Sequence, residues 1–153
     1  MSDTQITRNT TIDKATWKKQ PIDDLCTLRG GYGFPKRFQS QENGAIPFIK
    51  VSDMSLEGNE SEIRTANNHV DWELALAQGW RPFPPQSVVF AKVGGALKLN
   101  RRRKLNQPTL IDNNMMAAIP RSNVEPDFLY QLFQTSDFRD FAQEGAVPSV
   151  NQS

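Results

Sequence analysis

The chain has 153 residues, enough for one domain with a substantial core but too few for two comfortable ones. It is 37% hydrophobic and 23% charged, and its formal net charge of +1 gives no overall attraction to nucleic acid. One cysteine and one histidine exclude an internal disulfide and a thiolate or imidazole metal cluster, and no apolar run reaches the ~20 residues of a membrane helix.

The beginning of the chain is polar and lacks the apolar core of a secretory signal peptide. We expect a flexible leader over residues 1–16 and a single folded domain over residues 17–153, which starts at Trp17. Together with the single cysteine, these features predict a cytoplasmic protein.

The first folded segment predicts a short helix or turn followed by a loop. The helix or turn is expected over Pro21–Leu28, because proline suits the first turn of a helix, and Gly30 and Gly31 end it. Residues 32–44 are rich in glycine, asparagine and serine, and they predict a loop.

A strand and a short helix follow this loop. Residues 45–51, AIPFIKV, predict a strand at a sheet edge or with a bulge, because Pro47 lacks the N–H that a ladder needs. An apolar pattern of helical period begins at Val70, and Gly79 ends it.

The strongest strand pattern is SVVFAKV, residues 87–93, which is β-branched, apolar and bounded by Pro85 and Gly94. Residues 96–99 alternate in polarity and predict its hairpin partner across Gly94–Gly95. Residues 114–120 predict another buried strand.

The end of the chain has helical character. Four apolar side chains share one face of a predicted helix, and they are Phe128, Leu129, Leu132 and Phe133. Thr135 is placed to cap a second helix that Gly145 ends.

These elements predict an α+β fold with a strongly twisted, mostly antiparallel sheet flanked by short helices. The sheet is expected around Ile46–Val51, Ser87–Val93 and Met115–Ile119, and Asp127–Gln143 is expected to be helical.

Positive and negative charges are unevenly distributed along the chain. Residues 92–104, which we call the basic ribbon, contain no acidic residue and six cations: Lys92, Lys98, Arg101, Arg102, Arg103 and Lys104. Residues 53–73 hold Asp53, Glu57, Glu60, Glu62, Asp71 and Glu73 against Arg64 alone. Such blocks form two solvated surface patches in many proteins, and a contact surface for DNA or for an acidic protein in others.

The loop 32–44 also combines aromatic rings with positive charge. Tyr32, Phe34 and Phe38 alternate there with Lys36 and Arg37. We therefore expect this loop to contribute to the same surface as the basic ribbon.

The sequence offers no arrangement of residues typical of catalysis. It contains no Gly-x-Ser-x-Gly elbow and no P-loop, and His69, beside a helical pattern, is typical of a surface or capping histidine. We predict a protein that is not an enzyme and needs no cofactor. The alternative is a small Mg²⁺-dependent DNA endonuclease using the carboxylates of residues 53–62, although Gly58–Asn59 interrupts them with a predicted loop.

Several stretches, taken in order, resemble the target-recognition domain of a type I restriction–modification specificity subunit. They begin with Trp17, the IDDL step to Leu25 and Gly30–Gly31, and continue as GAIPFIKVSD, SVVFAKVGG, IDNNMMAAIP and the terminal GAVPSVNQS. Each piece is weak by itself, and their order and spacing over residues 17–153 carry the resemblance. A full subunit has two such domains and long spacer helices, whereas one copy is expected here.

The resemblance implies recognition of one half of a bipartite site in double-stranded DNA. It implies a modification subunit that brings S-adenosylmethionine and methyl transfer, and a restriction subunit that brings ATP-driven translocation and cleavage. No chemistry would belong to this chain, and no membrane is expected as a partner.

A DNA-reading domain needs contacts to phosphates for register and contacts to bases for specificity. The residues expected to supply them are Tyr32, Lys36, Arg37, Lys92, Gly94, Gly95, Lys98, Asn100, Arg101, Arg102, Arg103 and Lys104. Arginines among them are suited to guanine, Asn100, Asn106 and Gln107 to adenine, and the two glycines to a close backbone approach.

Overall fold

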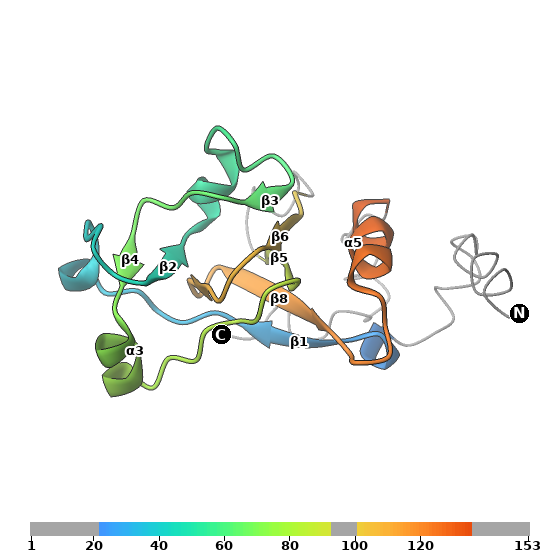
Figure 1. Ribbon diagram of the computed structural model, residues 1–153, viewed down its shortest axis with the longest axis horizontal. Coiled ribbons are helices and arrows are strands. Elements are labelled where there is room, and N and C mark those ends of the chain that lie inside the picture. Colours follow the sequence, from blue (N-terminus) through green and yellow to red (C-terminus); the bar gives the residue numbers. More distant parts are fainter. Residues whose placement is uncertain (1–21, 93–100, 136–153) are drawn as a thin grey trace, which may run out of the picture.

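The structure is a computed structural model that describes residues 22–92 and 101–135. These residues form an α+β fold with a five-stranded and a three-stranded sheet, not closed into a barrel (Figure 1). The predicted fold class is confirmed. Within the described residues, no helix is long and apolar enough to cross a membrane.

The larger sheet has the strand order β1-β8-β5-β6-β3. Its strands are β1 (Cys26–Gly30), β8 (Met115–Pro120), β5 (Val88–Ala91), β6 (Arg103–Leu105) and β3 (Glu62–Ile63). All neighbours are antiparallel except β3 and β6. β5 is buried at every position, because side chains pack against both faces of the sheet, and this explains its continuous apolar sequence.

The smaller sheet has the order β4-β2-β7, with β4 (His69–Val70), β2 (Ile46–Ile49) and β7 (Leu110–Ile111). The expectation that residues 46–51 share one sheet with the two later strands is therefore wrong. β2 is the middle strand, but its ladders are staggered, so Pro47 pairs with β4 alone. The chain then leaves the sheet in the 3₁₀ helix η3 (Val51–Ser55).

The prediction of a helix or turn through Leu28 is wrong in its second half. The 3₁₀ helix η1 (Ile22–Asp24) ends early, and Cys26–Gly30 pairs along its whole length with β8. Pairing with a distant strand overrides the local preference here. The predicted loop 32–44 is confirmed apart from the single turn η2 (Lys36–Phe38).

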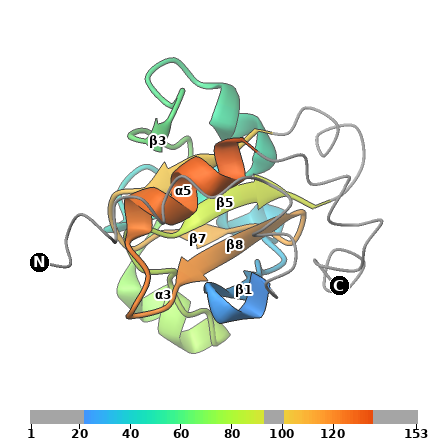
Figure 2. The same cartoon turned by 90° about the vertical axis from the view of Figure 1, so that its right-hand side faces the viewer.

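Within residues 22–92 and 101–135, two α-helices cover the sheets. In α3 (Trp72–Gln78), the Asp71 carboxylate accepts a hydrogen bond from the Leu74 N–H at 2.7 Å, and Gly79 ends the helix at φ 74°. Helix α5 (Pro126–Gln134) crosses one face of the larger sheet over β5 and β8 (Figure 2). Residues 136–143 of the predicted terminal helix lie outside the described residues.

The two faces of the larger sheet have separate cores. Leu129 and Phe133 of α5 are buried against Phe90 of β5, with the two phenyl rings 6.0 Å apart. A third core lies between the smaller sheet, α3 and residues 32–44, which we call the η2 loop. Phe34 of this loop stacks on Phe48 at 3.7 Å. The η2 loop is thus attached to the body of the domain by its own aromatic rings.

Candidate nucleic-acid interface

The basic ribbon does not present its cations on one face. β6 begins within it, and successive side chains of a strand point to opposite faces of the sheet. Arg103 accordingly donates from Nη2 to the Met54 carbonyl at 3.0 Å and from Nε to the Asn59 carbonyl. Lys104 instead lies against α5, with Nζ 2.6 Å from Asp127 Oδ1. These two cations fasten β6 to different parts of the fold.

Two further cations of the ribbon are buried. Arg102 is 1% exposed and Lys92 is 4% exposed. A charged group is kept in such a position only when it is paired or hydrogen-bonded, and Lys92 is one of the charges that act on the Asp112 carboxyl. Neither side chain offers surface to a DNA phosphate in this structure. Gly94, Gly95, Lys98 and Asn100 lie outside the described residues.

Arg101 is partly exposed next to η3, as Arg103 is. Its Nη1 donates to the Ser55 hydroxyl, which comes from the last residue of that 3₁₀ helix. The described chain therefore resumes at Arg101 beside η3. Any contact of Arg101 with a partner would include this edge of the molecule.

The η2 loop presents two exposed cations, Lys36 and Arg37. The backbone beneath them is held in place: Gln39 Nε2 donates to the Phe34 carbonyl at 2.8 Å, and the Phe38 ring meets the edge of Trp80 at 6.0 Å. The Arg37 guanidinium lies 4.5 Å from the centre of the Phe38 ring. A fixed backbone lowers the entropy lost when these cations bind a phosphate.

Tyr32 has a structural position at the start of the same loop. Its hydroxyl accepts a hydrogen bond from the Arg81 N–H at 3.1 Å, and its ring packs 6.3 Å from that of Phe83. The predicted contact of Tyr32 with DNA stays a prediction, and its observed contacts tie the loop to the segment after α3.

Both ends of the loop are fixed by glycines at close backbone approaches. A Cβ at Gly31 would lie 2.0 Å from the Asp112 carbonyl oxygen, and one at Gly44 would lie 2.1 Å from the Val70 carbonyl carbon. Any larger residue at either position would have to displace the neighbouring backbone. The loop therefore leaves and re-enters the fold at two tightly packed points.

Lys50 connects the η2 loop to η3, and the sequence did not single it out. Its Nζ donates to Gln39 Oε1 at 3.0 Å, and its N–H donates to Asp53 Oδ2 at 2.9 Å. Lys36 and Arg37 lie in η2, Lys50 directly follows β2, and Arg101 precedes β6 by two residues. We call these four residues the cationic row. A lone lysine after a strand is a weak sequence signal, because its connection to Gln39 is made only by the fold.

The acidic block at 53–62 serves the fold. Asp53 is 0% exposed, accepts from Asn67 Nδ2 at 3.0 Å, and has a pKa raised by burial above its ordinary value. Asn59 holds the following loop by donating to the Asp53 and Thr65 carbonyls. Glu62 pairs with Arg64 at 3.2 Å. In residues 22–92 and 101–135, no group of three or more His, Cys, Asp or Glu side chains could hold a metal ion.

Comparison with known proteins places the fold. No family model matches the chain, and neither does any curated protein. Solved structures do match it, among them the HsdS subunit from Thermoanaerobacter tengcongensis, with a TM-score of 0.53, 15% identity, and 74% of this chain and 26% of that one covered. The chain shares its fold with type I restriction–modification specificity subunits. The resemblance seen in the sequence is confirmed at this level.

Two further structures agree with this likeness to specificity subunits. A chain from work on the assembly and conformational transition of the type I R-M system has a TM-score of 0.55 at 16% identity and covers 74% of this chain and 26% of its own length. The type I S subunit from M. genitalium has a TM-score of 0.51 at 11% identity, and the match covers 80% of this chain and 27% of that one. This chain spans about a quarter of the length of the specificity subunits that it matches.

Proposed function

We propose that this chain is a non-catalytic module that recognises one half of a bipartite DNA site in a type I restriction–modification system. The observation that carries the proposal is the fold shared with specificity subunits. Methyl transfer from S-adenosylmethionine and ATP-driven restriction would then belong to the modification and restriction subunits with which this chain assembles.

The cationic row supplies positive charge for the proposed DNA contact. DNA affinity rests largely on neutralised phosphates, and each such contact changes the slope of log affinity against log salt by about 0.9. Lys36 and Arg37 are exposed, and Lys50 and Arg101 are partly exposed, so their charges are available without unfolding. We keep Gly94, Gly95, Lys98 and Asn100 in the proposed contact surface, since they connect Lys92 to Arg101.

Binding experiments on the assembled methyltransferase test this function. The target is first selected from random duplex DNA, and affinity is then measured by fluorescence anisotropy at several salt concentrations. We expect the double variant Lys36→Ala and Arg37→Ala to weaken binding and flatten the salt slope by up to about 1.8, two contacts at about 0.9 each.

A matched control is Arg121→Ala, which removes an exposed cation at the turn before α5. It should leave the slope unchanged. Selection that enriches no sequence would contradict the proposed function, and an unchanged slope for the double variant would remove the η2 loop from the contact surface.

A further inference from the structure

Helix α3 presents an apolar ridge to solvent. Trp72 is 55% exposed and Leu76 is 83% exposed, and they are the large hydrophobic residues that stand out as exposed in the described part of the chain. They are four residues apart, so they lie side by side on one face of the helix. Isolated apolar residues on a surface are ordinary, but a tryptophan and a leucine that are adjacent on a short helix form a small contact patch.

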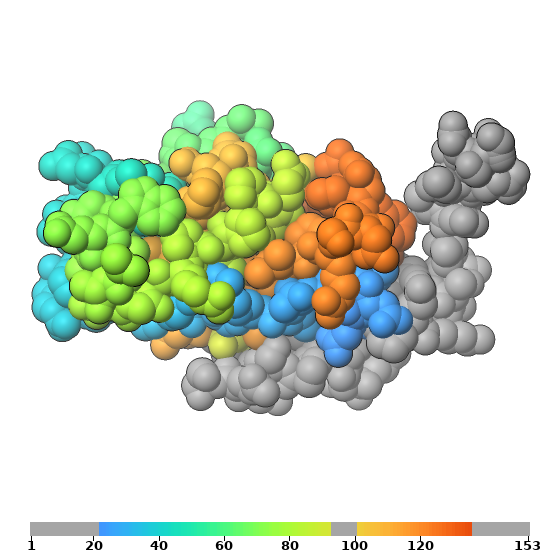
Figure 3. Space-filling model, turned by 60° about the horizontal axis from the view of Figure 1, so that its bottom comes forward, coloured from blue at the N-terminus to red at the C-terminus, as the bar shows by residue number. Residues whose placement is uncertain are grey.

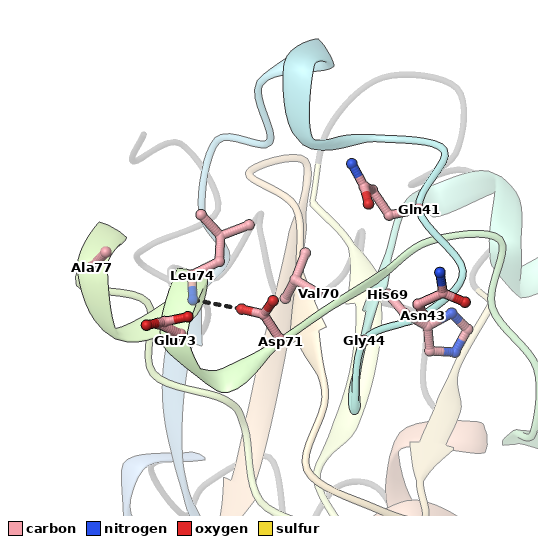
Figure 4. Close-up of a pocket in the computed structure, with 9 residues that line it drawn as sticks. All are labelled: Gln41, Asn43, Gly44, His69, Val70, Asp71, Glu73, Leu74 and Ala77. Atoms are coloured by element: carbon pink, nitrogen blue, oxygen red, sulfur yellow. Dashed lines mark hydrogen bonds between the residues drawn. The ribbon is translucent and has the colours of Figure 1, made fainter.

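A pocket of about 400 Å³ opens beside this ridge (Figure 4). Glu73 and Ala77 of α3 lie on one side of it, and each is one position along the helix from a ridge residue. Because one position turns an α-helix by about 100°, the ridge and the pocket wall are adjoining faces of α3. Together they form one continuous surface, at the end of the molecule opposite α5 (Figures 1 and 3).

The lining of the pocket is acidic and rich in hydrogen-bonding groups. Its residues are Gln41, Asn43, Gly44, His69, Val70, Asp71, Glu73, Leu74 and Ala77, with two carboxylates and no lysine or arginine. Asp71 uses Oδ1 to cap α3 and accepts there from the Leu74 N–H. The buried Nδ1 atom of His69 has no hydrogen-bond partner among the described residues. The pocket is therefore suited to a cationic group that donates several hydrogen bonds.

The wall opposite α3 is fixed in position. The His69 N–H donates to the Gln41 carbonyl at 2.8 Å, and the Ser40 N–H donates to Asn68 Oδ1 at 2.6 Å. Gly44 packs directly on the Val70 backbone. A preformed pocket loses little entropy when an occupant enters.

We propose that the α3 surface docks a partner protein through a basic side chain next to an apolar one. A lysine or arginine of the partner enters the pocket toward Asp71 and Glu73, and the apolar neighbour packs on Trp72 and Leu76. Charge complementarity selects this occupant, because two carboxylates repel DNA phosphates and attract a cation. The wall of the pocket opposite α3 belongs to the same loop, residues 32–44, that carries Lys36 and Arg37, so a docked partner would lie next to those two cations.

The test uses the full chain and the modification subunit of its own system, so the choice of partner rests on the proposed function. Association is measured by isothermal titration calorimetry. We expect Trp72→Ala with Leu76→Ala, and separately Glu73→Lys, to weaken it by about tenfold or more, as removal of a contact hot spot does. Glu57→Lys is the matched control, since it reverses an exposed carboxylate outside this surface, and it should bind like the parent.

Other outcomes overturn the proposal. The proposal fails if the parent chain does not bind the modification subunit. It also fails if the variants bind that subunit with an affinity within about twofold of the parent. Loss of self-association in the Leu76→Ala variant would overturn it as well, because the occupant would then be a second copy. If the complex forms but selects no DNA sequence, the proposed function fails and the docking surface stands.

Discussion

The ammonium group of Lys50 donates to the side-chain oxygen of Gln39 across 3.0 Å, joining the end of β2 to the η2 loop. The same loop carries Lys36 and Arg37, and the residue after Lys50 begins η3. One hydrogen bond therefore joins Lys50 to a loop whose two cations are fourteen and thirteen residues away in the chain. It acts together with the aromatic rings and the close-packed glycines that hold the same loop.

Replacing Lys50 by methionine tests whether it acts through its charge. Methionine keeps much of the unbranched length of the side chain, so we expect a small change in melting temperature, weaker DNA binding and a salt slope flatter by about 0.9. Lys50→Arg retains the charge and serves as the control. Equal slopes for the methionine variant and the parent would show that neither the charge of Lys50 nor its hydrogen bond to Gln39 contributes to DNA binding.

Substitutions of Arg101 and Arg103 should differ in their effect on the stability of the fold. Arg103→Ala leaves the Met54 and Asn59 carbonyls without its hydrogen bonds, so unfolding in urea should show a loss of about 1–3 kcal/mol. Arg101→Ala removes one partly exposed contact, so the free energy of unfolding should stay within about 0.5 kcal/mol of the parent. The opposite order of stabilities would reject these assignments.

Phe133 holds α5 on the sheet. It is fully buried against Phe90, and Phe133→Ala should cost about 3–5 kcal/mol of unfolding free energy. Phe128→Ala, at a partly buried position on the same helix, should cost less. Thermal and urea denaturation of both variants measure the difference, and equal costs would show that the packing of α5 is not centred on Phe133.

The buried carboxyl of Asp53 predicts a pH dependence of stability. Burial raises its pKa in the folded state above the ordinary 3.8, so the folded protein holds this proton to higher pH than the unfolded chain does. The stability that it contributes is fully present below pH 3.8 and falls as pH rises through the folded-state pKa. Asp53→Asn should flatten this part of the profile while costing a cap hydrogen bond, and urea titrations at a series of pH values measure both effects. If the Asp53→Asn variant keeps the pH profile of the parent, another group causes this pH dependence of stability.

The nuclease alternative has a direct test. Plasmid DNA incubated with the pure chain and Mg²⁺ should remain supercoiled, because Asp53 is committed to capping η3 and bonding Asn67. Glu60→Ala provides a variant at an exposed carboxylate of the same block. Mg²⁺-dependent cleavage that this substitution abolishes would establish the alternative.

The elements that the sequence predicted well are those with local causes. β5 and β8 are continuous apolar runs, and α3 has an apolar pattern of helical period that Gly79 ends. β1 was predicted as a helix or turn because its strand state depends on β8, nearly ninety residues later. The separate sheet around β2 likewise depends on β4 and β7.

The candidate site was predicted less completely, because a run of charged residues in a sequence does not show which way each side chain points. The run from Arg101 to Lys104 looks uniform, yet the pairing of β6 with β5 sends Arg103 toward η3 and Lys104 toward α5. The η2 cations, in contrast, could be identified because their loop contains its own aromatic anchors. Lys50 acquires its role only through contact with Gln39.

The close packing at Gly31 and Gly44 fixes both ends of the segment between them on β7 and β4. Inside the segment, Phe34 and Phe38 belong to the core, whereas Lys36 and Arg37 are exposed. Substitutions at the two exposed positions could therefore change the charge of this surface while the buried rings keep the segment in place.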